Sequence, residues 1–548
     1  MAYSAKDEKP EISYHDSIHK SSTDGETFGK PSGKHHTPKS PEERLAALQE
    51  ALKVDPGPKP GGWAAIQLYL ITLVVCCCSG DSGFDGTVMG GINGMHQYQQ
   101  YFGMKEVGAK TSIVFGIFTV GSLCGMIPAS YFPDKFGRRF SMFFGNAVLV
   151  IGAIITANAR NKGMFLAGRW LTGVGSGCAG ASAKSYLAEM APAHQRGAFM
   201  GFLNSFYYVG QMTATGMMVA TNKWQNELSW RLPLYIQAVP AGINVIFIYL
   251  CPESPRWLYS EGRTDEARQI LANLHSRNRD VNSPLVGLEM EEIEEKIQVD
   301  GADKRWWDFR PLFRTRSDRY SAYMVILIGS FGQLSGNGLI TYFLPVLLKQ
   351  AGIVNQNKIL TLNFVNSVTS YIGALSGSFI VDRFGRRRIL LTGTASITVI
   401  LAIVAGLLSS QGSAARANAG ITFVYLFMVV FSFGWTSMQA LYPAEVLGYQ
   451  ARAKGLAFLG VVSQVASLIN TFGMPVALEK LTWKVYIIFT VWDAFEVLVI
   501  YFFVVETKGF TLEEIGEIFG QDNPRQYSNK LLKDARLNRE AHKQSAAA

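Results

Sequence analysis

A six-residue motif, Asp-x-Phe-Gly-Arg-Arg, occurs twice in this chain, at residues 134–139 and again, 248 residues later, at 382–387. Between the copies lies a polar segment, residues 252–320, which is the long charged interruption between apolar runs. A motif that recurs on both sides of such a divider indicates an internal duplication. The fold is therefore predicted to consist of two halves that correspond element by element.

Further residues support the duplication. A glutamate followed seven residues later by an arginine returns after 256 residues, and an acidic residue closes each half. The residues concerned are Glu189 with Arg196, Glu445 with Arg452, and Glu253 with Glu506. Several markers at nearly one offset are hard to obtain by chance.

Composition assigns both halves to a membrane. Of the 548 residues, 48% are apolar and only 17% are charged, which is too apolar for a soluble chain of this length. The net charge of +9 comes from Lys and Arg clusters beside apolar runs, as the positive-inside bias requires, so we expect no nucleic-acid partner. The six cysteines lie in apolar runs without metal-ligand spacing, so we expect no metal site.

Twelve apolar runs are long enough to span a bilayer, which needs about 20 residues per helix. They lie near residues 64–89, 111–130, 140–158, 164–188, 197–220, 232–251, 321–348, 359–381, 389–410, 420–443, 453–475 and 484–504. The predicted division of the chain is a disordered tail (1–60), a six-helix half (61–251), a loop with short helices (252–320), a second six-helix half (321–505) and a tail (506–548). Twelve spans place both tails, the loop and the Arg-rich turns on one side, which the charge bias makes cytoplasmic.

These features resemble the sugar porter branch of the major facilitator superfamily along nearly all of residues 64–520. The matching motifs are Gly83-Phe-Asp85, both Arg-rich turns, Gly168-Arg169, Pro252-Glu-Ser-Pro-Arg-Trp257, Gly332-Gln-Leu-Ser-Gly336 and Glu506-Thr-Lys-Gly509. Segments 83–91, 334–338 and 434–443 look most similar to fungal lactose permeases and cellodextrin transporters. The resemblance implies an all-α membrane protein with twelve transmembrane helices in two six-helix halves.

The charged turns suggest a gate. Acidic and basic residues at helix ends on one face can pair between neighbouring helices and part when the protein opens there. The resemblance assigns this role to the same positions, although the charges also serve as topology signals. The candidates are Asp134, Arg138, Arg139, Glu189, Arg196, Asp382, Arg386, Arg387, Glu445 and Arg452.

Asp85 and Arg169 lie inside apolar runs, where an ionisable side chain is costly and indicates a functional site. The resemblance implies that the acid faces the arginine and carries a transported proton. Protonation would release the arginine, so proton binding can bias one orientation of the protein. A static ion pair in a facilitator is the alternative. Asp81, four residues earlier on the same helical face, also remains a candidate for the titrating carboxyl.

A sugar site needs amides and hydroxyls that donate and accept, together with aromatic walls. Gln211 and Gln333 match the family's sugar-binding glutamines, and Asn337 lies four residues after Gln333, on the same face of a continuous helix. Tyr342 and Phe343 are candidate walls or gates. Tyr207 and Tyr208 are weaker candidates, since core packing explains aromatic residues equally well.

The sequence departs from hexose porters at several of these positions. Gly332 stands where they carry the first of two glutamines, and Gly338 stands at their downstream asparagine. Their cavity tryptophans correspond to Ala440 and Gln464. A roomier site would suit a disaccharide, although Gln439, Gln464 or Trp435 could refill the space, so a hexose stays open.

The predicted function is proton-coupled uptake of a disaccharide or hexose by alternating access in the plasma membrane, with organelle membranes still possible. The partners are a sugar, a proton and the bilayer. We expect a monomer without a cofactor, because no nucleotide-binding loop is present, and no enzyme, because no catalytic arrangement stands out. The alternatives are a carrier of a polyol, organic acid or secondary metabolite, an uncoupled facilitator, and a nutrient sensor.

Overall fold

The computed structural model describes residues 41–192, 195–300, 309–409, 414–447, 452–508, 510, 512–531 and 533, in which all regular structure is helical. The first half contains α2 (Trp63–Asn93), α3 (His96–Phe102), α4 (Ala109–Phe136), α5 (Arg138–Ala157), α6 (Lys162–Met190), α7 (Arg196–Thr221), α8 (Leu228–Phe247) and η1 (Ile248–Leu250). The second contains α12 (Arg316–Leu334), α13 (Asn337–Gln350), α14 (Gln356–Phe384), α15 (Arg386–Ser409), α16 (Ala414–Val446), α17 (Arg452–Leu481) and α18 (Lys484–Phe503).

Each of the twelve predicted runs falls on helical segments, the run 321–348 on two of them. Within the described ranges, nine helices are long and apolar enough to cross a membrane, with α12 and α13 counted as one stretch. Helices α6, α7 and α14 are not among the nine but have comparable lengths of 29, 26 and 29 residues. The prediction of an all-α membrane protein is confirmed.

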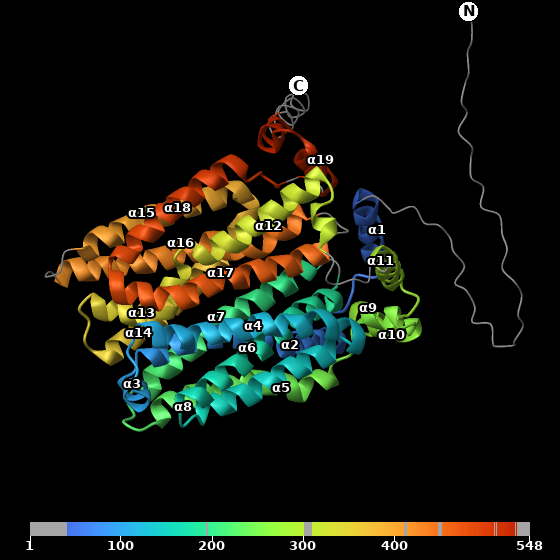
Figure 1. Cartoon of the computed structure of the whole chain (residues 1–548). Helices are drawn as coiled ribbons and strands as arrows, with labels where there is room; N and C mark the ends of the chain where they lie inside the picture. The colour runs from blue at the N-terminus through green and yellow to red at the C-terminus, as the bar shows by residue number, and fades with distance from the viewer. Residues whose placement is uncertain are drawn as a thin grey trace, which may run out of the picture. The chain divides into compact units, whose positions relative to one another are not determined.

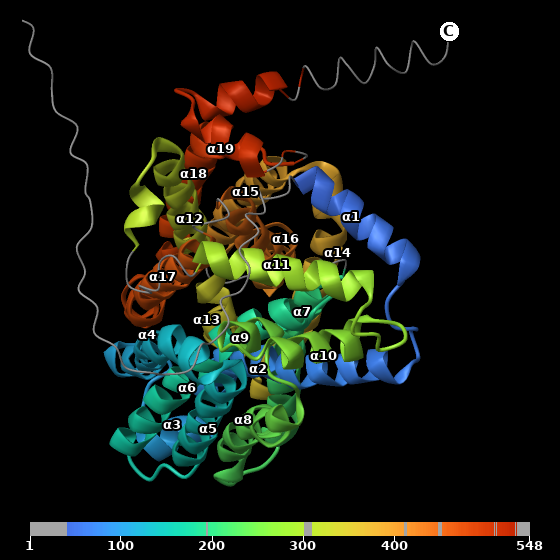
Figure 2. The same cartoon turned by 90° about the vertical axis from the view of Figure 1, so that its right-hand side faces the viewer.

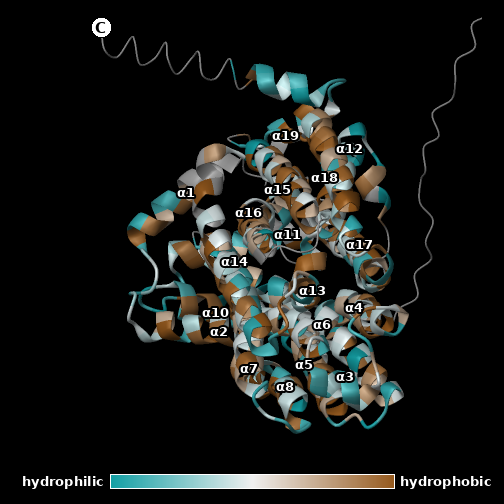
Figure 3. Cartoon of the chain, turned by 90° about the vertical axis from the view of Figure 1, so that its left-hand side faces the viewer, coloured by the Kyte–Doolittle hydropathy of each residue, from teal (hydrophilic) through white to brown (hydrophobic). Residues whose placement is uncertain are grey.

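The two halves lie side by side as separate layers of helices (Figure 1). They meet along three pairs of helices, α4 with α17, α7 with α14, and α2 with α13. Large apolar side chains such as Ile246 and Val491 are exposed on the outside of the bundle. Hydrophobic residues accordingly extend along the membrane helices (Figure 3), as a surrounding hydrocarbon phase requires.

The run predicted as one helix over 321–348 is broken. Helix α12 ends at Leu334 and α13 begins at Asn337, with Gly336 at φ +82° between them. A left-handed backbone of this kind is accessible to glycine at little cost and stops the regular helix. The break lies where α12 and α13 each contact α16 and α17, so it falls inside the bundle.

Short helices cover one end of the bundle, which we call the arginine end because the turns at Gly137 and Gly385 lie there; the other is the distal end. These helices are α1 (Pro41–Val54), α9 (Pro255–Ser260), α10 (Thr264–His275), α11 (Pro284–Asp300), η2 (Arg310–Phe313) and α19 (Leu512–Gly520) (Figure 2). Helix α1 contacts α11, and Asp55 after it accepts hydrogen bonds from the Arg277 N–H (3.0 Å) and the Ser283 hydroxyl (2.6 Å). The last part of the predicted disordered tail is therefore helical, and residues 1–40 lie outside the described ranges.

Candidate functional site

Asp85 and Arg169 meet inside the first half. Arg169 Nη1 donates to Asp85 Oδ1 at 2.5 Å, and the side chains are almost fully buried. Gln237 Nε2 of α8 donates to the same oxygen at 2.5 Å, while Phe118 lies 4.7 Å beneath the guanidinium. Helices α2, α6 and α8 thus converge on one carboxylate that is held by a cation and an amide.

Gln237 was missed at the sequence level. It lies 152 residues from Asp85, and a single glutamine in an apolar run carries no indication of its partner. The usable signal was its polarity inside the sixth run, since a buried amide must find a hydrogen-bond partner.

Asp81 lies one turn before Asp85 and is 1% exposed. Its Oδ1 has no hydrogen-bond partner among the described residues, and the contact to Arg169 is made by Asp85. The geometry therefore distinguishes the two carboxyls: Asp85 has a counter-charge, whereas Asp81 is buried without one.

The predicted sugar ligands are distributed over three helices. Gln211 on α7 is buried, whereas Gln333 on α12 and Asn337 on α13 are half-buried. The expectation that Gln333 and Asn337 share one helical face is wrong, because the break after Leu334 separates them. Asn337 Oδ1 accepts a hydrogen bond from the Thr341 hydroxyl at 3.0 Å, the i+4 position of its own helix.

Two amides from other helices fill space beside the glycines of this region. Gln439 Nε2 of α16 donates to the Gly332 carbonyl at 3.1 Å, and a Cβ at Gly332 would lie 2.9 Å from Gln439 Cδ. Asn470 Nδ2 of α17 donates to the Gln333 carbonyl, and a Cβ at Gly338 would lie 3.1 Å from that nitrogen. Asn470 is a candidate ligand that sequence reasoning missed.

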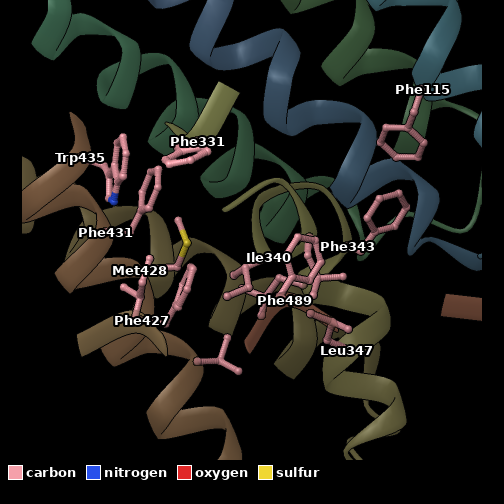
Figure 4. Close-up of a cluster of buried hydrophobic side chains, with 14 of the residues drawn as sticks. Phe115, Phe331, Ile340, Phe343, Leu347, Phe427, Met428, Phe431, Trp435 and Phe489 are labelled. Carbon is pink, nitrogen blue, oxygen red and sulfur yellow. The ribbon is translucent and has the colours of Figure 1, made fainter. Parts of the chain in front are cut away.

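The aromatic candidates differ in position. Tyr342 is half-buried, with its ring 6.0 Å from that of Phe115. Phe343 is fully buried and packs against Phe115 at 4.9 Å (Figure 4), so it belongs to the core between the halves. The hydroxyl of Tyr208 is 2.8 Å from that of Thr436, across the two halves.

Trp435 does not refill the space near Gly332. It is fully buried among hydrophobic side chains (Figure 4), and its Nε1 donates to the Thr394 hydroxyl at 3.2 Å. Gln464 Nε2 donates to Ser122 across the halves at 3.0 Å. The side chain of Ala440 lies outside the described part of the chain.

The charged turns form matching networks in the two halves. Arg138 Nε lies 3.0 Å from Glu189 Oε2, and Arg386 Nη2 lies 2.7 Å from Glu445 Oε1. Further contacts join Asp134 to Arg138 (3.4 Å), Arg139 to Glu253 (3.4 Å) and the Arg387 N–H to Glu506 (3.2 Å). Each of these contacts joins two residues of the same half.

Arg196, at the start of α7, contacts the central loop. Its Nη1 lies 3.5 Å from Glu292 Oε1 of α11. The side chains of Asp382 and Arg452 lie outside the described residues. Their predicted gate roles stay predictions.

The sequence analysis did not identify two further groups of charged and polar residues. Lys184 lies in the run 164–188 and is exposed, so this run carries a second cation besides Arg169. At the distal end, Lys349 of α13 bonds to Glu106 and to the Gly94 carbonyl, and Gln356 Nε2 donates to Asn222 at 2.5 Å. These contacts join the halves at the end opposite the Arg-rich turns.

The family model described as sugar (and other) transporter matches residues 71–519. This chain belongs to that family. It is 28% identical to the high-affinity glucose transporter of Kluyveromyces lactis, covering 83% of this chain and 86% of the relative. It is also 28% identical to the probable polyol transporter 4 of Arabidopsis thaliana, with 80% and 82% covered.

Solved structures show the same fold. The inward-open conformation of the xylose transporter XylE from E. coli superposes with a TM-score of 0.68 at 21% identity, covering 82% of this chain and 99% of that one. A crystal structure of the D-xylose-proton symporter gives a TM-score of 0.64 at 19% identity, covering 81% and 99%. The chain therefore has the fold of the major facilitator superfamily, which is a multi-pass membrane transporter fold.

Proposed function

We propose that this protein is a proton-coupled sugar transporter of the plasma membrane, with its arginine end and both tails in the cytoplasm. The observation that supports it most is the Asp85 carboxylate, buried in the bundle and held by Arg169 and Gln237. A buried carboxylate with one cationic partner can exchange that partner for a proton. The relatives named as glucose and polyol transporters support a sugar or sugar-like solute.

Proton binding would act through the three helices that meet at Asp85. When Asp85 is charged, Arg169 and Gln237 tie α2 to α6 and α8. A proton on Asp85 removes the charge and weakens both hydrogen bonds, which frees α2 to move against α6. Because α2 also contacts α13 across the halves, the change reaches the helix that carries Asn337.

The sugar would lie among Gln211, Gln333, Asn337 and Tyr342. Amides can donate to and accept from ring hydroxyls, and a half-buried tyrosine offers a face for the apolar side of the ring. Gln439 and Asn470 refill part of the space left by Gly332 and Gly338. Ala440 and Gln464 stand where hexose porters carry cavity tryptophans, and the loss of these two rings still favours a disaccharide over a hexose.

Uptake of labelled lactose, cellobiose and glucose by a transporter-null yeast at acidic and neutral pH tests the proposal. Wild type should accumulate one sugar against its gradient at acidic pH, and Asp85→Asn should only equilibrate it. Asp81→Asn is the matched control, since Asp81 makes no contact with Arg169. Equal accumulation by wild type and Asp85→Asn would contradict coupling through Asp85.

Lys184 favours a second candidate, a carrier of anionic solutes such as organic acids. Its exposed side chain adds a cation to α6, the helix that carries Arg169. Competition of organic acids against labelled sugar uptake distinguishes the two. Inhibition by an acid that is lost in Lys184→Gln would support this second function.

A further inference from the structure

Helix α18 carries two carboxyl groups that the proposed mechanism does not use. Asp493 and Glu496 lie three residues apart near the middle of this membrane helix, and both are fully buried. Residues with this spacing share one helical face. Both oxygens of Asp493 and Oε2 of Glu496 lack a hydrogen-bond partner among the described residues.

No cation faces the pair from the neighbouring helices. Helices α15, α17 and, through Phe331, α12 pack against α18, and in their described ranges the charged residues lie at the ends. These residues are Arg386, Arg387 and Arg388 on α15, Arg452, Lys454, Glu479 and Lys480 on α17, and Arg316, Asp318 and Arg319 on α12. A carboxylate without a counter-charge at the centre of a membrane helix is costly, so the pair must take up a proton.

A second unpartnered polar group lies at the break between α12 and α13, which adjoins α18. Ser335, at the break between α12 and α13, is fully buried, and its hydroxyl has no partner among the described residues. A Cβ at the adjacent Gly336 would lie 3.6 Å from the ring of Phe489, one turn before Asp493. The break in the helix that carries Gln333 therefore adjoins the face of α18 that holds the carboxyls.

A direct contact connects Glu496 to α12. Trp492 Nε1 donates to Glu496 Oε1 at 2.6 Å, and the Trp492 ring meets that of Phe331 at 6.1 Å, edge to face. Phe331 lies two residues before Gln333. A change of charge on Glu496 would alter the hydrogen bond that orients Trp492, and Trp492 packs against the helix proposed to bind sugar.

The internal duplication gives the position a counterpart. Asp493 lies 256 residues after Gln237. The same offset separates Glu189 from Glu445, and it also separates the first residue of α8 from the first residue of α18. Gln237 is the amide that contacts the Asp85 carboxylate in the first half. The second half thus carries a carboxyl where the first half places a partner of its proton site.

We propose that Asp493 and Glu496 form a second proton-binding site, in the second half, that exchanges its proton as α12 responds to sugar. The inference rests on the proposed function, because it adds a second proton site to the same transport cycle. Neutral amides mimic the protonated pair at nearly the same size. Asp493→Asn/Glu496→Gln should therefore fold and exchange sugar, but should no longer load and release this proton.

Infrared difference spectra of the purified full chain, between acidic and neutral pH, test the site without requiring transport. Wild type should show protonated-carboxyl signals, one set lost in Asp85→Asn and a separate set lost in Asp493→Asn/Glu496→Gln. Trp492→Phe should shift the Glu496 signal without removing it, because it deletes the Nε1 donor and keeps a ring. Glu479→Gln, at the exposed end of α17, is the matched control. Carboxyl signals that are unchanged in the double variant would overturn the site.

Proteoliposomes supplied with lactose, cellobiose or glucose test its role in coupling. The proton-to-sugar ratio should fall in the double variant while sugar counterflow persists. A ratio equal to that of wild type, with Asp85→Asn uncoupled, overturns this inference and leaves the proposed function standing. No pH-driven uptake by wild type overturns the proposed function, and the infrared result then decides the site alone. Carboxyl signals that respond to Na⁺ or K⁺ instead of pH would overturn the proton as ligand.

Discussion

Gly332 on α12 has no side chain, and the Gln439 side chain of α16 occupies the space beside it. The glycine leaves room for the Gln439 amide, which donates to the Gly332 carbonyl at 3.1 Å. A residue with a side chain at position 332 would occupy the space that this amide now fills. The polar group near the proposed sugar site therefore comes from α16 in this chain, and its position depends on the absence of a single Cβ.

Gly332→Ala is expected to weaken sugar binding. The new Cβ would lie 2.9 Å from Gln439 Cδ, so the amide must move, at a cost of about 1–3 kcal/mol for overpacking. The KM for uptake should rise severalfold, Gln439→Ser alone should raise it as well, and adding Gly332→Ala to Gln439→Ser should raise it little further. Gly473→Ala is the control, because a Cβ there meets no atom within 4 Å. An unchanged KM in Gly332→Ala would show that Gln439 is not part of the site.

At the scale of elements, sequence reasoning predicted helices well because hydrocarbon demands long apolar segments with satisfied backbones. It did not predict where α12 breaks, since Gln333 and Asn337 look like i and i+4 of one helix until Gly336 adopts φ +82°. It identified Asp85 and Arg169 through their charge. Gln237 and Asn470 escaped because an uncharged amide shows its role only through partners far away in sequence.

The distal end is closed by contacts between the halves. The ion pair of Lys349 with Glu106 is the charge-assisted contact there, and such contacts are stronger than hydrogen bonds between neutral groups. Lys349→Gln should favour opening there. Ser112→Cys reports this, because Ser112 is buried at the distal end and its hydroxyl bonds to the Phe472 carbonyl across the halves at 2.5 Å. An impermeant maleimide should label it severalfold faster in the Lys349→Gln background.

Lys358→Gln provides the comparison, since Lys358 is exposed near the same end. It should leave the labelling rate of Ser112→Cys unchanged. Equal rates in both backgrounds would mean that the ion pair does not hold the halves together.

The helices at the arginine end contain a buried pair that responds to pH. His275 Nδ1 of α10 lies 2.5 Å from Glu289 Oε2, and its Nε2 lies 3.0 Å from the carbonyl of Met190 at the end of α6. Burial lowers the pKa of His275, but the charge and hydrogen bond of Glu289 outweigh it, so the pKa lies above its ordinary value. Arg196 opposes this rise.

A raised pKa in the folded state means that the protonated histidine stabilises the fold below the ordinary pKa of about 6.5, and that this stability is lost as pH rises through the folded-state pKa. His275→Gln should therefore lower the Tm of the purified protein most at acidic pH. Breaking a buried pair costs about 3–5 kcal/mol. A difference from wild type that grows as pH rises would contradict the pairing.

At the scale of the whole molecule, each half ends by returning to the start of its third membrane helix, α5 or α15. Glu253 after α8 accepts from the Arg138 N–H at 3.1 Å, and Glu506 after α18 accepts from the Arg386 N–H at 2.8 Å. The carboxylates sit at the N-termini of α5 and α15, where the helix dipole favours negative charge. Each acid thereby closes its own half, and neither bond crosses between the halves.

This symmetry predicts that Glu253→Gln and Glu506→Gln have similar and independent effects. Each removes a charge from a helix N-terminus and weakens charge-assisted bonds, which should lower the free energy of unfolding by about 1–3 kcal/mol. Because the sites share no partner, the double variant should lose the sum of the single losses. Thermal unfolding of the four proteins checks this. A double loss well above the sum would show that the two ends are energetically coupled across the bundle.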